Sequence, residues 1–165
     1  MFRTARVIAV IFVMQPMLMP LASAQAATAS SNILVTATVL SFCTIAASPL
    51  PFGNYSAPAL AVNTSIVVAC TATTGYSVGL SAGGATGATV TTRQMTGATG
   101  TTPLNYALFR DAGFTLNWGL TTGTNTVAGT GTGLPQTITV FGQVAANQLV
   151  TPGLYSDTVV ATITY

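Results

Sequence analysis

The sequence has very few charged side chains and no histidine. Beyond residue 24 the charged residues are Arg93, Arg110, Asp111 and Asp157. General acid–base catalysis, metal coordination and nucleic-acid binding all need clusters of titratable or cationic groups. The sequence therefore predicts a protein that is not an enzyme, holds no metal or cofactor and binds no nucleic acid.

Long apolar segments are also lacking, apart from a short one near the start. Arginines stand at positions 3 and 6, an apolar run covers residues 7–14, and Ala22-Ser23-Ala24 follows. This order is typical of a secretory signal peptide. A membrane-spanning helix needs about 20 apolar residues, and nothing later approaches that length. We therefore predict a signal peptide at residues 1–24, an exported protein and no integral membrane span.

Cysteine is scarce too, since the chain contains only Cys43 and Cys70. In an exported chain, two cysteines favour a structural disulfide. Closing that loop would restrict the unfolded chain by about 3 to 4 kcal/mol. The alternative, a catalytic cysteine, needs an activating base, and the sequence has no histidine to supply one.

What the chain does contain is the pattern of β-strands, with apolar residues at every second position and no long amphipathic helix. The cleanest alternation lies at the end, where one face carries Val159, Ala161, Ile163 and Tyr165. Two stretches, residues 81–102 and 121–133, are rich in Gly, Thr and Ala and fit either loops or weak edge strands. Short strands divided by turn residues predict one all-β sandwich domain.

An ordered set of short motifs resembles the spore coat protein U domain family. The resemblance covers residues 33–165 and is carried by Cys43-Thr44-Ile45, Phe52-Gly53-Asn54-Tyr55, Ile66 to Thr71, Arg93-Gln94-Met95, Leu104 to Asp111, Asn117-Trp118-Gly119, Val140 to Val144, Gly153 to Val159 and Thr162 to Tyr165. Members of that family are similar to subunits of archaic (Csu-type) chaperone–usher pili of Gram-negative bacteria. The resemblance implies an incomplete immunoglobulin-like β-sandwich that is completed by a donated strand.

The same resemblance implies that the mature chain consists of two segments with different functions. Residues 25–40 would be an N-terminal donor-strand segment, and residues 41–165 would be the pilin domain. The donor side chains would be Ile33, Val35, Ala37 and Val39. The alternative is that these residues form an ordinary first strand of their own sandwich, and the alternation does not decide which phase faces inward.

The final strand would line the vacant groove, through Val159, Ala161, Ile163 and Tyr165. Its alternative is a paired interior strand, which needs the same alternation.

Three further features have structural interpretations. We expect Tyr155 and Asp157 to fix the geometry of a strand edge, and Arg110 and Asp111 to form a turn with a local ion pair. Trp118 is expected in the core, with a ligand-stacking platform as the alternative.

The predicted function is a structural subunit of a secreted pilus, assembled by donor-strand exchange and supporting adhesion and biofilm formation. Its partners would be a periplasmic chaperone, an outer-membrane usher and neighbouring pilin subunits, and it would pass through the periplasm to the cell surface. A secreted carbohydrate-binding module and a tip adhesin are the alternatives. Without the signal peptide the formal side-chain charge is zero, which favours association between chains.

Overall fold

The computed structural model describes residues 25–98 and 102–165, so the predicted signal peptide lies outside the described residues. Contacts divide the chain into a unit that ends at Ala37 and a unit that runs from Thr38 to Tyr165. Residues 25–42 form no strand or helix, and their side chains are exposed. In the described residues, no helix has the length and apolarity to cross a bilayer.

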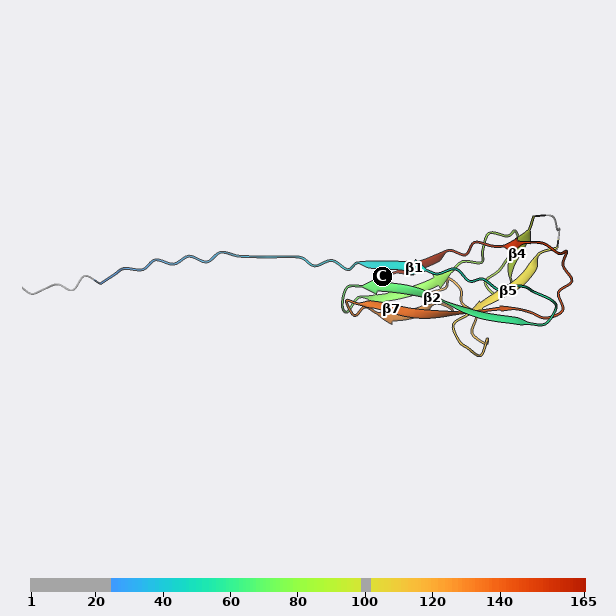
Figure 1. Cartoon of the computed structure of the whole chain (residues 1–165). Coiled ribbons are helices and arrows are strands. Elements are labelled where there is room, and N and C mark those ends of the chain that lie inside the picture. The colour runs from blue at the N-terminus through green and yellow to red at the C-terminus, as the bar shows by residue number, and fades with distance from the viewer. Residues whose placement is uncertain (1–24, 99–101) are drawn as a thin grey trace, which may run out of the picture. The chain divides into compact units, whose positions relative to one another are not determined.

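The second unit consists of antiparallel strands in two sheets (Figure 1). The strands are β1 (Cys43–Ala47), β2 (Leu60–Cys70), β3 (Gly75–Leu80), β4 (Arg93–Gly97), β5 (Leu104–Phe109), β6 (Val127–Thr130), β7 (Pro135–Val144), β8 (Tyr155–Ser156) and β9 (Ala161–Thr164). One sheet has the order β1-β2-β7-β5-β4-β8, and the other has the order β6-β3-β9.

The core lies between the two sheets and takes apolar side chains from both. Val68 of β2 and Val140 of β7 are buried on the larger sheet, and Val78 and Leu80 of β3 are buried on the smaller one. Trp118 is fully buried, and its indole Nε1 donates a hydrogen bond to the Val78 carbonyl oxygen at 2.9 Å. The expected all-β sandwich with a core tryptophan is confirmed, and a buried indole has no free face on which a sugar could stack.

A buried arginine joins the smaller sheet to the loops beside it. The guanidinium of Arg93 is 0% exposed and donates to the carbonyl oxygens of Leu80, Ser81, Val90 and Trp118 at 2.7–3.2 Å. Burial lowers the pKa of Arg93, and the nearby Tyr106 and Asp157 oppose that shift. Because the buried charge is fully hydrogen-bonded, it stabilises one arrangement of the strands around it.

The structure decides two local expectations. The Gly- and Thr-rich stretches are not only loops, because they contain β4 and the edge strand β6. The expected ion pair between Arg110 and Asp111 was wrong: Arg110 donates to the carbonyl oxygens of Thr124 and Thr126, and Asp111 accepts amide hydrogen bonds. Arg110 therefore bonds to backbone carbonyl oxygens of residues 124–126, and Asp111 bonds to backbone amides that follow it in the chain.

Cys43 and Cys70 form a disulfide across the first strand pair. The bond joins the first residue of β1 to the last residue of β2, and the two cysteines face each other in the register. It confirms the expected pairing and closes a loop with a sequence separation of 27.

Replacing both cysteines with serine should lower the free energy of unfolding by about 3 to 4 kcal/mol, because the open chain gains conformational entropy. Urea unfolding followed by the emission of Trp118, the single tryptophan, measures this change. The matched control is the wild-type chain with its disulfide reduced, which should unfold at the same urea concentration as the variant. An unchanged midpoint in both would contradict the stabilising role of the disulfide.

Candidate strand-binding groove

Each sheet ends in a strand with one unpaired edge on the same side of the sandwich. Among the described residues, β9 pairs only with β3, and β1 pairs only with β2. The two strands lie near each other although they belong to different sheets. An edge strand presents a row of backbone N–H and C=O groups that can pair with a further strand. Among the described residues, each of these two strands therefore keeps one edge without a strand partner.

An apolar groove of about 1180 Å³ opens beside these edges. Its floor is made of core side chains from both sheets: Ile66, Leu80, Met95, Leu104, Tyr106, Leu108, Val140 and Val144. One wall is the segment of residues 47–57 that follows β1, and the other is the segment of residues 148–159 that leads towards β9. The floor side chains are 9% exposed or less, so the two walls, which form no long strand, take the place that a strand has in a complete sandwich.

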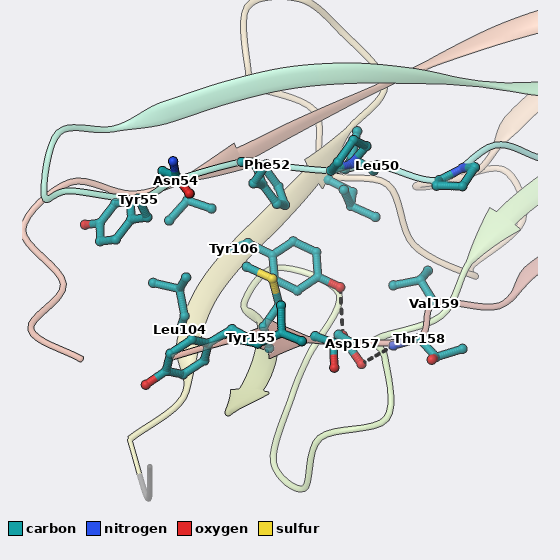
Figure 2. Close-up of a pocket in the computed structure, with 18 of the residues that line it drawn as sticks. Leu50, Phe52, Asn54, Tyr55, Leu104, Tyr106, Tyr155, Asp157, Thr158 and Val159 are labelled. Atoms are coloured by element: carbon teal, nitrogen blue, oxygen red, sulfur yellow. Dashed lines mark hydrogen bonds between the residues drawn. The ribbon is translucent and has the colours of Figure 1, made fainter. Parts of the chain in front are cut away.

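The two walls run in opposite directions along the groove. Figure 2 shows Tyr55 and Tyr155 towards one end, and Leu50 and Val159 towards the other. The stretch from Tyr155 in the second wall to Ala161 at the start of β9 covers seven residues, or about 20 Å in extended conformation. A strand of about seven residues would therefore span the groove.

Two side chains of the first wall reach into the groove over a glycine of β7. A Cβ atom on Gly142 would lie 2.6 Å from Cδ2 of Leu50 and 3.0 Å from Cζ of Phe52. Phe52 also meets Tyr106 edge to face, with ring centroids 5.8 Å apart. The missing side chain at Gly142 lets the wall approach the sheet, so this glycine marks a close approach of chain segments.

Asp157 holds the second wall in place through both carboxylate oxygens. Oδ1 accepts hydrogen bonds from the amides of Gly84 at 2.8 Å and Thr158 at 2.7 Å. Oδ2 accepts a hydrogen bond from the Tyr106 hydroxyl at 2.7 Å. Figure 2 shows this link between the floor and the wall. The carboxylate thus fixes the wall to both the groove floor and the loop after β3.

Burial and the hydrogen bond to Asp157 change the pKa of the Tyr106 hydroxyl. Burial raises the pKa of Tyr106 well above its ordinary value of 10.0, and the hydrogen bond to Asp157 adds to the shift. The phenol therefore remains a neutral donor towards the carboxylate at physiological pH.

Hydrogen bonds also fix the far end of the first wall. The hydroxyl of Tyr55 donates to the Ala145 carbonyl oxygen at 2.9 Å and accepts from the Gln148 amide at 2.9 Å. The side chain of Gln148 in turn bonds both backbone groups of Asn105 on β5. Because both walls are held by such bonds, the groove is preformed.

Of the four residues of the final strand that were predicted to line the groove, two line it and two do not. Val159 and Ala161 line it, as the alternation suggested. Ile163 instead packs against the core opposite Val78, and Tyr165 is 55% exposed, so neither belongs to the lining.

The predicted donor side chains lie outside any strand. Ile33, Val35 and Val39 are between 85% and 88% exposed, and Ala37 is exposed as well. They do not form a first strand of the sandwich in this structure, which was the alternative interpretation.

Sequence reasoning missed most of the groove lining. Leu50 and Phe52 lie in a proline-containing segment, and this segment forms one wall of the groove. The apolar residues between and after its two prolines were the available signal. Leu104 and Tyr106 belong to one of the motifs, but period-2 alternation does not tell whether the face of a strand is covered.

Comparison with known proteins agrees with this geometry. The model of the Spore Coat Protein U domain family matches residues 29–162. Protein U of Myxococcus xanthus is 37% identical over 158 residues, which cover 86% of this chain and 88% of that protein.

A solved structure gives a similar result for the fold. It is the crystal structure of the CsuC-CsuE chaperone-tip adhesion subunit pre-assembly complex from archaic chaperone-usher Csu pili of Acinetobacter baumannii. The match has a TM-score of 0.60 and 25% sequence identity, and it covers 78% of this chain and 41% of the other. This likeness confirms the expected immunoglobulin-like fold class, and the chain spans less than half of the chain that it matches.

The Tyr106 environment predicts a loss of stability at high pH. The pKa of Tyr106 in the folded state is raised above its value near 10 in the unfolded state. The contribution of Tyr106 to the free energy of unfolding is therefore complete below pH 10 and falls as the pH rises further. Tyr106→Phe should remove this pH dependence, and Tyr155→Phe is the control that should keep it. Urea unfolding at several pH values from 8 to about 11 measures both; an equal alkaline fall in all three proteins would contradict the assignment.

Proposed function

Since this chain belongs to the Spore Coat Protein U domain family, we propose that it is a structural subunit of a surface pilus assembled by donor-strand exchange. In this scheme, a periplasmic chaperone first fills the groove with a strand of its own. An outer-membrane usher then exchanges that strand for the N-terminal segment of the next subunit. The resulting fibre would be exposed on the cell surface and support adhesion and biofilm formation.

The observation that carries the proposal is the apolar groove between the segments of residues 47–57 and 148–159, next to the ends of β1 and β9. A strand laid there would pair with an open edge through its backbone and cover the floor with alternate side chains. The likeness to a chaperone–subunit complex supports a chaperone as the first occupant. Among the described residues, no group of three or more His, Cys, Asp or Glu side chains is placed to hold a metal ion.

The exposed N-terminal segment has the properties that the groove requires. Residues 33–39 number seven, which matches the length of the stretch from Tyr155 to Ala161. Four of them, Ile33, Val35, Ala37 and Val39, form a face without polar side chains. Burying each of the larger ones contributes about 1.5 to 3 kcal/mol. Backbone hydrogen bonds to the open edge add to this gain.

The apolar lining also favours one alternation phase of the donor. The opposite face of the segment places Thr36 and Thr38 between two leucines. A threonine hydroxyl that faces the groove floor would lose water without a partner and cost about 1 to 3 kcal/mol. We therefore assign the face with Ile33, Val35 and Val39 to the groove.

A pair of substitutions tests the donor segment and its phase together. Val35→Asp should abolish incorporation into fibres, because it puts a carboxylate into the apolar groove. Thr36→Asp adds the same charge to the outward face, and it should leave at least half of the wild-type fibre yield. Pilus yield on cells that also produce the cognate chaperone and usher is the readout. The proposed phase is refuted when Thr36→Asp blocks assembly and Val35→Asp does not.

Deletion of residues 25–38 separates folding from polymerisation. The shortened subunit keeps the groove, so we expect it to copurify with the chaperone in a one-to-one complex and to be absent from fibres. Copurification followed by electron microscopy of the cells measures both properties. Fibres of normal length built from the shortened subunit would show that this segment is not the donor.

A further inference from the structure

The smaller sheet has a second free edge, on the side opposite to β9. Among the described residues, β6 pairs only with β3, and none of the β6 residues lines the groove. A free edge strand can pair with a strand of another molecule. Strand addition at β6 would compete with strand addition at the groove, so the two edges need to be distinguished.

Backbone hydrogen bonds indicate which groups of β6 face this free edge. Directly after β6, Gly131 directs both backbone groups towards the chain that leads into β3. Its amide donates to the Thr74 carbonyl oxygen at 2.7 Å, and its carbonyl oxygen accepts from the Thr73 amide at 2.9 Å. In an antiparallel ladder this direction alternates from one residue to the next. Ala128 and Thr130 therefore direct their backbone groups towards the free edge, and both residues are exposed.

Arg110 occupies the beginning of the same edge. Its Nη1 donates to the Thr126 carbonyl oxygen at 3.0 Å, and its Nη2 donates to the Thr124 carbonyl oxygen at 3.3 Å. Thr126 directly precedes β6, and the same alternation directs its backbone groups away from β3. The guanidinium therefore takes an acceptor that an added strand would need. It shortens the available edge from residues 126–130 to residues 128–130, which is at the lower limit of strand length.

The charge of Arg110 protects this edge in addition to its hydrogen bonds. Edge strands are commonly kept from pairing by charged side chains or by proline. β6 itself contains neither, and residues 112–156 contain no charged side chain. A strand that added at Thr126 would displace the guanidinium from its acceptors or bury it without a partner. Both changes cost free energy.

The strand that this edge would otherwise accept is β6 of a second copy of the chain. Two identical edges can pair antiparallel about a twofold axis, because each offers the same groups to the other. Beyond residue 24 the formal side-chain charge is zero, so charge adds no repulsion between copies. Nothing but the cap at the start of β6 then opposes this pairing.

From these observations we propose that Arg110 is a specificity-determining residue for strand addition. It closes the free edge of β6 to β6 of a second copy and so restricts strand uptake to the groove. The inference rests on the proposed function only in taking the groove as the acceptor site. It goes further by assigning a role to a charged residue that lies outside the groove.

Replacing Arg110 with glutamine tests this role in the mature chain. Arg110→Gln removes the charge and shortens the side chain, so the chain should pair through β6 as its concentration rises. Hydrogen exchange of the Ala128 and Thr130 amides measures this pairing. In the wild type both amides should exchange fast at every concentration. In the variant they should exchange about tenfold more slowly once about 90% of the chains are paired.

Two matched variants separate the edge from other causes of association. Arg110→Lys keeps a charge at the edge and should behave as the wild type. Ala128→Pro removes the outward amide of residue 128 without removing a bond to β3, and proline is tolerated on the open side of an edge strand. Added to Arg110→Gln, it should restore fast exchange of the Thr130 amide. Association through the groove does not depend on Ala128 and would persist in this double variant.

Urea unfolding followed by Trp118 emission checks that each variant keeps its fold. If Arg110→Gln is unfolded, Arg110→Met, which keeps an apolar stem of similar length, takes its place in the same measurements. The expected result for Arg110→Met is the same, because it also lacks the charge and the donors.

The proposal is overturned if the folded neutral variant exchanges both amides as fast as the wild type at every concentration. It is equally overturned if Arg110→Lys pairs as readily as Arg110→Gln, or if slow exchange of the Thr130 amide persists with Ala128→Pro. These results are distinguishable from a failure of the proposed function. That function is refuted by the fibre assays on the donor segment, which leave the role of Arg110 at β6 intact.

Discussion

The unpaired edge of β9 is the constraint on which the rest of this structure depends. Among the described residues, the backbone N–H and C=O groups along that edge have no strand partner, and the apolar groove lies beside the segment that leads to β9. One added strand would pair with the edge and fill the groove. The walls are prepared for it, because Asp157 holds one and Tyr55 the other. A preformed groove loses little conformational entropy when a strand binds.

Those parts of the architecture that depend on local pattern could be predicted from the sequence. Alternation predicted that Val159 and Ala161 share one face and line the groove, because side chains on a strand point to alternate sides. The pairing of Cys43 with Cys70 followed from the export signal and the cysteine count. The motifs led to the correct family because their order along the chain is more specific than any one of them.

What could not be predicted depends on contacts between distant segments. Arg93 was recognised only as part of a motif, and its interior position depends on carbonyl oxygens from separate segments that satisfy its guanidinium. Phe52 too was recognised only as part of a motif, and only the approach of its segment to Gly142 reveals a groove wall. Similarly, the interpretation of Arg110 and Asp111 as a pair failed because backbone groups of the folded loop compete for both side chains.

The most direct test of the central claim is a contact measurement in fibres made from a mixture of differently labelled subunits. Half of the chains would carry labelled valine and the other half labelled tyrosine, and solid-state NMR would detect only contacts between chains. The account predicts a contact between Val35 of one subunit and Tyr106 of its neighbour. It would be contradicted if the mixed fibres showed no such contact while chains that carry both labels, diluted into unlabelled chains, showed it.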